Sequence, residues 1–94
     1  MSTFVLIHGA GSGASYWHLV QPRLEAAGHV VVAVDLPCDD DRAGLAEYLA
    51  TTLVTIGDRT DLVVVAQSMG GFTAPLVADR VPVDLIVLVA ASGY

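Results

Sequence analysis

Four short apolar runs are spaced along the 94-residue sequence. They are Phe4–Ile7, Val30–Val34, Leu62–Ala66 and Leu85–Ala90. Each run is rich in Leu or β-branched residues and lacks the alternation of apolar and polar positions that a strand with one solvated face shows. Runs of this kind are typical of strands that are covered on both faces. The pattern therefore predicts four parallel β-strands.

Segments with helical spacing lie between these runs. They are Tyr16–Ala27 before Gly28, Arg42–Ile56 before Gly57, with Asp41 as the expected N-cap, and Met69–Arg80 before Pro82. Glycine or proline directly after the last turn is a common helix stop signal. The order β-α-β-α-β-α-β predicts one α/β unit over residues 1–94, with an open parallel four-stranded sheet and helices on both faces. Functional residues of such sheets lie beyond the carboxyl ends of the strands.

The composition indicates part of a larger domain. The chain is 54% apolar with a mean hydropathy of +0.65, which excludes a disordered protein. A chain this short buries only about 60–65% of its unfolded surface. The sequence also stops just after the fourth run, where an α/β domain would continue with a covering helix. If the chain ends at Tyr94, we expect copies to associate through the exposed last strand.

Charge and cysteine content exclude several classes of function. The net charge is −6, so we expect no nucleic acid and no anionic membrane as partner. Lysine is absent, which excludes a Schiff base, a Ser–Lys dyad and a P-loop. Cys38 is the only cysteine, so no intrachain disulfide forms. No signal peptide or membrane-spanning run is evident, and we expect a soluble, cytoplasmic protein.

The turn after the third predicted strand carries the clearest chemical signal. In Ala66-Gln67-Ser68-Met69-Gly70, Ser68 lies between a strand and a helix, where the turn projects its Oγ away from the sheet. The N–H groups of the first helical turn favour negative charge nearby. A serine that only caps a helix fits the same five residues, so the motif alone leaves both interpretations open.

These five residues resemble the Gly-x-Ser-x-Gly nucleophile elbow of the α/β-hydrolase superfamily, with alanine in place of the first glycine. His8-Gly9-Ala10-Gly11, after the first predicted strand, is similar to the His-Gly oxyanion segment of that superfamily. The stretch Phe4–Leu36 is especially similar to small esterases related to the plant methylesterases and hydroxynitrile lyases. The chain thus resembles the N-terminal half of an α/β-hydrolase fold.

The resemblance implies a serine hydrolase that acts on a carboxylic ester or related small acyl substrate through an acyl-serine intermediate. Ser68 would be the nucleophile. The backbone N–H groups of Ala10 and Met69 would form the oxyanion hole, which stabilises the tetrahedral intermediate. The family needs no cofactor for this reaction.

The rest of a catalytic triad is missing from the sequence. In this superfamily the acid and the histidine follow the nucleophile, but no histidine follows Ser68. Asp79 and Asp84 are predicted away from the carboxyl ends of the strands. The earlier histidines are placed no better: His8 is expected to hydrogen-bond within its turn, His18 lies in a predicted helix, and His29 precedes a strand. No pair of histidines has metal-ligand spacing, so we expect no metal site.

Two alternatives stay open. Gly9–Ala14 after a strand, with Asp35 about twenty residues on, also fits a dinucleotide-binding fingerprint of the Rossmann type. The bulky pair Tyr16-Trp17 at the start of the next helix disfavours it. The other alternative is a truncated, non-catalytic α/β-hydrolase-like protein. The acidic run Asp39–Asp41 is interpreted as a solvated loop that caps a helix.

Overall fold

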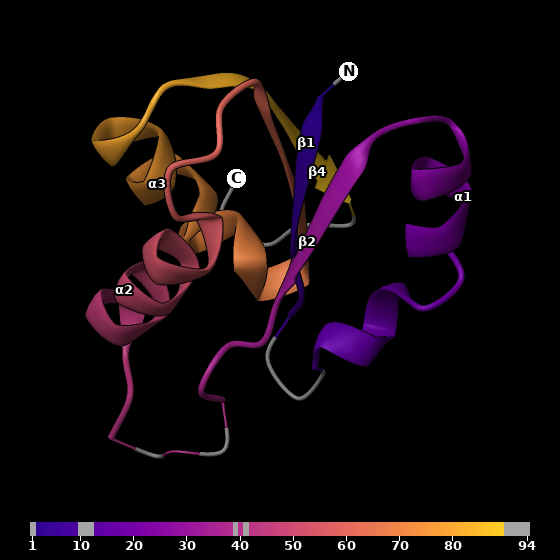
Figure 1. Ribbon diagram of the computed structural model, residues 1–94. Helices are drawn as coiled ribbons and strands as arrows, with labels where there is room; N and C mark the ends of the chain where they lie inside the picture. The colour runs from indigo at the N-terminus through magenta and orange to yellow at the C-terminus, as the bar shows by residue number, and fades with distance from the viewer. Residues whose placement is uncertain (1, 10–12, 39, 41, 90–94) are drawn as a thin grey trace.

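The computed structural model describes residues 2–9, 13–38, 40 and 42–89. Within these residues four strands form one parallel sheet: β1 (Thr3–Ile7), β2 (Val30–Val34), β3 (Leu62–Gln67) and β4 (Val83–Val89). Their order across the sheet is β2-β1-β3-β4. Figure 1 shows this sheet with the helices around it. The predicted open parallel sheet is confirmed.

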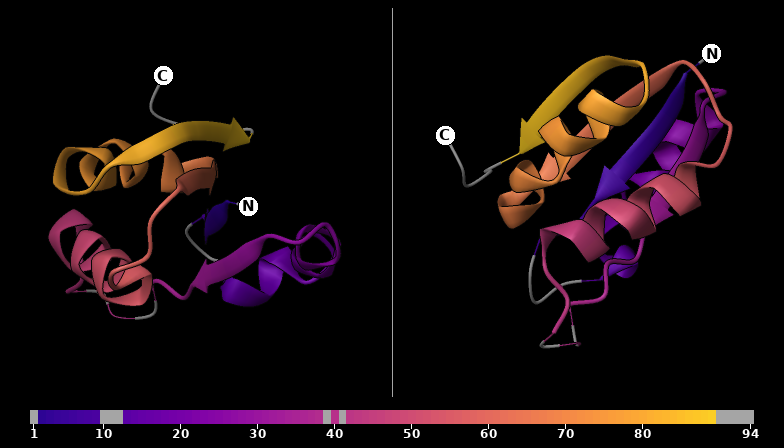
Figure 2. Two further views of the ribbon diagram at one scale, coloured as in Figure 1. Left: turned by 45° about the horizontal axis from the view of Figure 1, so that its top comes forward. Right: turned by 90° about the vertical axis from the view of Figure 1, so that its left-hand side faces the viewer.

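Helices pack on both faces of this sheet, as predicted (Figure 2). In the described part they are η1 (Ala14–Trp17), α1 (Gln21–Ala26), α2 (Leu45–Ile56), η2 (Ser68–Phe72) and α3 (Ala74–Arg80), where η marks a 3₁₀ helix. Helices α2 and α3 cover one face, and α1 lies on the other against β2.

The core lies between the sheet and the pair α2 and α3. Its buried apolar residues are Val5, Ile7, Val34, Leu36, Ile56, Leu62, Val64, Ala66, Ala74 and Val77. Full burial of one Val, Leu or Ile side chain contributes about 1.5–3 kcal/mol. The core therefore holds β1 and β3, which carry the candidate site at their carboxyl ends, in a fixed register.

That register brings two distant segments together. Ile7, the last residue of β1, pairs with Ala66 of β3, although the two residues are 59 positions apart in the sequence. The chain leaving β1 at His8 and the chain leaving β3 at Ser68 are therefore neighbours at the carboxyl edge of the sheet. The predicted oxyanion segment and the predicted nucleophile thus lie side by side.

Two of the predicted helices are wrong as single elements. Tyr16–Ala27 divides into η1 and α1, and Met69–Arg80 divides into η2 and α3. Pro22 and Pro75 lie in the first turns of α1 and α3. Proline has no N–H to donate and fits the first helical turn better than the interior, so each proline favours a new start.

The bounds of two further elements also differ from the prediction. Helix α2 begins at Leu45 rather than Arg42, with Gly44 as its N-cap, and the Gly44 N–H donates to Glu47 Oε1 at 2.6 Å. The predicted cap Asp41 lies outside the described residues. Strand β4 begins at Val83, two residues earlier than predicted, so Asp84 lies inside the strand.

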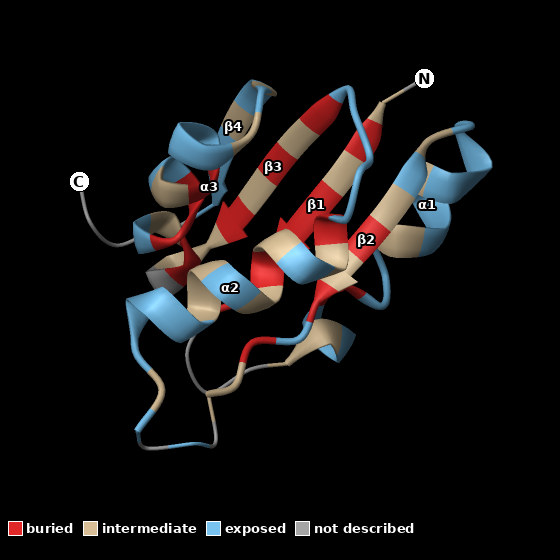
Figure 3. Cartoon of the chain, turned by 60° about the vertical axis from the view of Figure 1, so that its left-hand side comes forward, coloured by how far each residue is buried: buried red, intermediate tan, exposed pale blue. Residues whose placement is uncertain are grey.

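Strand β4 contradicts the expectation that all four strands are covered on both faces. Its apolar side chains remain partly in solvent, with exposed fractions of 56% for Leu85, 38% for Val87, 53% for Leu88 and 40% for Val89 (Figure 3). It pairs with β3 along one edge, and no strand of the described part pairs with its other edge. The composition of β4 is that of a buried strand, but its position is that of an edge.

Candidate active site

Ser68 lies at a strained turn between β3 and η2. Its φ angle is +53°, in the left-handed region, and Asp61 is the other described non-glycine residue with positive φ. For an L-residue with a side chain this conformation costs roughly 1–2 kcal/mol. Strain of this kind is typical of functional sites, where the surrounding structure holds the residue in place. The strand, the turn at Ser68 and the following helix are arranged as the sequence predicted.

Two glycines allow the turn after β3 to approach the end of β1. A Cβ atom on Gly70 would lie 3.0 Å from both Cγ2 and the carbonyl oxygen of Ile7. A Cβ atom on Gly9 would lie 2.7 Å from Gln67 Oε1 and 2.9 Å from Ser68 Cβ. Side chains at these positions would push the two segments apart, so the glycines bring Ser68 close to the loop after β1.

His8 holds this loop from inside the protein. It is fully buried, and its Nδ1–H donates to the carbonyl oxygen of Gly9 at 2.7 Å. Its Nε2 accepts the N–H of Leu36 at 2.9 Å, which requires the tautomer with the proton on Nδ1. Since both ring nitrogens are engaged, His8 is not the base for Ser68. It has the hydrogen-bonding role within the turn that the sequence predicted.

The other two histidines are bonded elsewhere. His29 precedes β2 at the amino edge of the sheet, opposite Ser68, where its Nδ1 accepts the N–H of Ser2 at 3.2 Å. His18 lies after η1, with its Nδ1 3.0 Å from the carbonyl oxygen of Ser15. No histidine of the described part is therefore placed as a base for Ser68.

The acidic residues after Ser68 are also in the wrong place for a triad. Asp79 is exposed near the end of α3, and Asp84 is the second residue of β4, at the amino edge of the sheet. Asp35 does follow the carboxyl end of β2, but its Oδ1 accepts the N–H of Ala14 at 3.1 Å. The structure therefore brings neither acid of the later chain to Ser68.

The same contact of Asp35 weakens the dinucleotide interpretation. A pyrophosphate binds the free N–H groups at the start of an α-helix. Here the helix after the glycine-rich segment is η1, a 3₁₀ helix of four residues, and the carboxylate of Asp35 accepts its first N–H. A phosphate at this position would be repelled by that negative charge.

Of the two predicted oxyanion donors, Met69 lies in the described residues and Ala10 does not. Met69 is the second residue of η2, and the first N–H groups of a helix have no acceptor within the helix. Ala10 lies outside the described residues. Its neighbour Gly9 is described, and its N–H donates to Gln67 Oε1 at 3.0 Å. Sequence reasoning missed Gln67, although a polar residue directly before the nucleophile was a signal for it.

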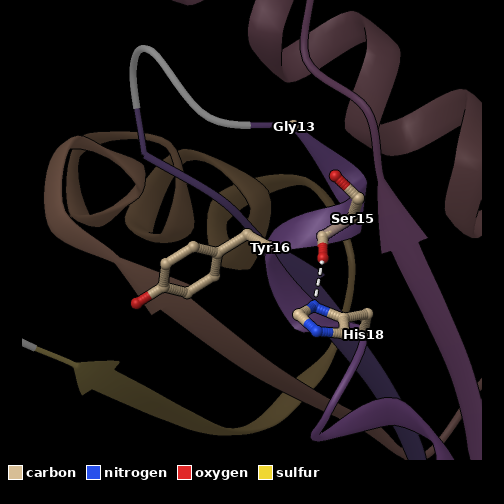
Figure 4. A pocket seen from close by; sticks show the side chains of 4 residues that line it. All are labelled: Gly13, Ser15, Tyr16 and His18. Atoms are coloured by element: carbon tan, nitrogen blue, oxygen red, sulfur yellow. Dashed lines mark hydrogen bonds between the residues drawn. The ribbon is translucent and has the colours of Figure 1, made fainter.

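A shallow hollow lies beside η1, lined by Gly13, Ser15, Tyr16 and His18 (Figure 4). The Tyr16 ring points away from His18 and is half-exposed. Ser68 does not line this hollow. Trp17 is buried and packs its ring edge-to-face against the ring of Tyr16. The hollow is therefore not where the proposed nucleophile lies.

Cys38 contacts the first part of α2 rather than Ser68. A side-chain hydrogen bond with Cys38 raises the pKa of the Tyr48 phenol, and desolvation and the Coulombic interaction with Cys38 raise it further. Both side chains pack against the core. This placement agrees with a packing role for Cys38.

Among the residues that the structure describes, no group of three or more His, Cys, Asp or Glu side chains is placed to hold a metal ion. No helix in the described ranges is long and apolar enough to cross a membrane.

Comparison with known proteins identifies the class. Residues 4–94 match the Alpha/beta hydrolase family, and the chain belongs to this family. It is 45% identical to Methylesterase 7 of Arabidopsis thaliana and 37% identical to the Alpha-hydroxynitrile lyase of the same plant. These alignments cover 94% and 97% of the chain.

Solved structures show the same fold over the whole length. Polyneuridine aldehyde esterase superposes with a TM-score of 0.85 at 29% identity, over 97% of this chain. An extracellular α/β-hydrolase from a Paenibacillus species gives a TM-score of 0.88 at 24% identity. The chain spans 39% of the length of Methylesterase 7 and 40% of the chain of polyneuridine aldehyde esterase.

Proposed function

We propose that this chain carries the nucleophile and oxyanion hole of a serine hydrolase that cleaves a small carboxylic ester. The observation that carries the proposal is the conformation of Ser68. A non-glycine residue at φ +53°, between a parallel strand and a helix and packed against the loop after β1, suits an exposed catalytic Oγ. A serine that merely caps a helix does not need this strain.

In the proposed reaction Oγ of Ser68 attacks the ester carbonyl carbon while a base takes its proton. The N–H groups of Met69 and Ala10 stabilise the oxyanion of the tetrahedral intermediate, and each such donor contributes about 3–4 kcal/mol to lowering the barrier. The C–O bond to the alcohol then breaks, with a proton transferred to the leaving alcohol. Water hydrolyses the acyl-serine in a second, equivalent step.

The proposal requires a histidine and a carboxylate from polypeptide beyond these 94 residues. None of His8, His18 and His29 is placed as the base. The relatives named above include esterases and are more than twice as long as this chain, which supports an ester as substrate and a longer catalytic unit. We therefore expect the isolated 94-residue chain to hydrolyse activated esters no faster than its Ser68→Ala variant. A cytoplasmic location is part of the proposal.

The test uses the protein in the length that its source organism makes. Its intact mass is measured, and it is treated with a fluorophosphonate, which reacts covalently with activated serines. Peptide mass spectrometry should find the label on Ser68, together with hydrolysis of a simple ester. A label on another serine, or ester hydrolysis with Ser68 unlabelled, would contradict the proposal.

For the 94-residue chain by itself we propose self-association through β4. No strand in the described ranges pairs with its outer edge, and unprotected edges pair with other strands. The strand carries one charge, Asp84, near its beginning. In antiparallel pairing of two copies the two Asp84 carboxylates lie at opposite ends, so they do not repel each other closely.

The 94-residue chain is therefore expected to form an oligomer, and a single charged substitution in β4 should dissociate it. Leu85→Lys places an ammonium on the exposed face of β4 and is expected to give a monomer. Leu19→Lys makes the same change of charge at a residue that is 70% exposed outside the sheet, and should leave the oligomer intact. Light scattering after size-exclusion chromatography gives the masses. A monomeric wild-type chain would overturn this proposal.

A further inference from the structure

The side chain of Gln67 connects the nucleophile turn to the loop after β1. Gln67 is the last residue of β3, directly before Ser68, and its Oε1 accepts the N–H of Gly9 at 3.0 Å. The two residues are 58 positions apart in the sequence. We propose that Gln67 is a positioning residue that sets the distance between the nucleophile and the first oxyanion donor. This inference rests on the proposed function.

Gly9 is held at both of its backbone polar groups. Its N–H donates to Gln67, and its carbonyl oxygen accepts the Nδ1–H of His8 at 2.7 Å. That carbonyl belongs to the planar amide that joins Gly9 to Ala10, the residue that supplies the proposed donor. Fixing Gly9 at both groups holds the loop after β1 against the turn at Ser68.

The contact is tight as well as polar. The space beside Gly9 is filled by Gln67 Oε1, Ser68 Cβ and the Gln67 carbonyl oxygen, which would lie 2.7, 2.9 and 3.3 Å from a Cβ at this position. Gly9 is buried and Gln67 is half-buried. If Gln67 no longer accepts the hydrogen bond, the Gly9 N–H loses its partner and the loop can shift relative to Ser68.

Two substitutions of Gln67 separate the effect of its hydrogen-bond acceptor from the effect of its side-chain volume. Gln67→Leu keeps a similar volume but removes the acceptor, whereas Gln67→Glu keeps an oxygen that can accept the Gly9 N–H. In the protein of its source length, we expect Gln67→Leu to lower kcat for ester hydrolysis by about 10- to 100-fold, because displacements near 1 Å cost up to about 100-fold. KM should change little. Gln67→Glu should recover most of kcat.

A second readout does not depend on catalysis. Amide hydrogen exchange of Gly9, followed by NMR in the 94-residue chain, should become faster in Gln67→Leu and stay slow in Gln67→Glu. Gln21→Leu, at the first residue of α1, is the matched control and should change neither Gly9 exchange nor kcat. Circular dichroism confirms that each variant is folded.

The outcomes separate this inference from the proposed function. Unchanged kcat in Gln67→Leu, with faster Gly9 exchange, overturns the positioning role and leaves Ser68 as the nucleophile. Unchanged Gly9 exchange overturns the hydrogen bond itself. If wild-type protein shows no hydrolysis that depends on Ser68, the proposed function fails first, before any Gln67 variant is needed.

Discussion

Ser68→Ala is expected to lower kcat/KM for ester hydrolysis by about 10⁴-fold or more, because removing the nucleophile of a serine hydrolase leaves only oxyanion-hole and binding effects. The protein of its source length is used, since the proposed base and acid lie outside the 94 residues. The rates of wild type and variant are compared with the same ester under the same conditions. A loss of less than tenfold would exclude Ser68 as the nucleophile.

The free energy of unfolding of Ser68 variants provides a second measurement. Alanine should keep the fold, because it adopts the turn at a cost similar to that of serine. Ser68→Gly relieves the strain at φ +53° and should raise the free energy of unfolding by about 1 kcal/mol while abolishing hydrolysis. Thr60→Ala removes an exposed hydroxyl from the segment before β3 and should change neither rate nor stability. A Ser68→Gly variant less stable than wild type would show that the turn is not strained.

Among substitutions that add one methyl group near the site, Gly9→Ala is expected to lower stability and hydrolysis the most. The new Cβ would lie 2.7 Å from Gln67 Oε1 and 2.9 Å from Ser68 Cβ, closer than side chains tolerate. Insertion of a carbon into a well-packed region costs about 1–3 kcal/mol. The chain should relieve the clash by moving the loop away from Ser68, so hydrolysis should be lost together with stability.

The matched control for this variant is Gly44→Ala at the start of α2. There the nearest atom to the new Cβ is Glu47 Oε1 at 3.6 Å, an ordinary contact, and the free energy of unfolding should change by less than about 1 kcal/mol. Urea denaturation of the 94-residue chain measures both variants. Equal stabilities for Gly9→Ala and Gly44→Ala would show that the approach of the two segments is looser than the structure indicates.

The exposure of β4 can be compared with the length of the relatives in the family. The relatives are more than twice as long as this chain, and β4 has the apolar composition of a strand covered on both faces. Composition alone predicts that cover. An apolar composition indicates that a strand is buried, but it does not say which residues bury it. The exposed fractions of Leu85 and Leu88 show only how far the described residues cover the strand.

The amino-acid sequence was sufficient for the sheet and for the sharp turn at Ser68. Four β-branched runs with glycine and proline between them leave few alternatives to a parallel α/β unit, and Ser68 beside Gly70 and Gly71 indicates a sharp turn that needs small neighbours. These are local properties of the chain. Helix bounds were less accurate, because Pro22 and Pro75 fit equally a kink, a break or a first turn until packing selects one.

The contacts across the site depended on the pairing of β1 with β3. Nothing local to Gly9 shows that Gln67 lies beside it, because the hydrogen bond spans 58 positions and exists through the register of two strands. The long-range contacts of His8 with the N–H of Leu36 and of Asp35 with the N–H of Ala14 were similarly hidden, since each partner comes from another part of the chain. Long-range register comes from how the whole core packs, so these contacts follow from the tertiary structure and not from sequence pattern.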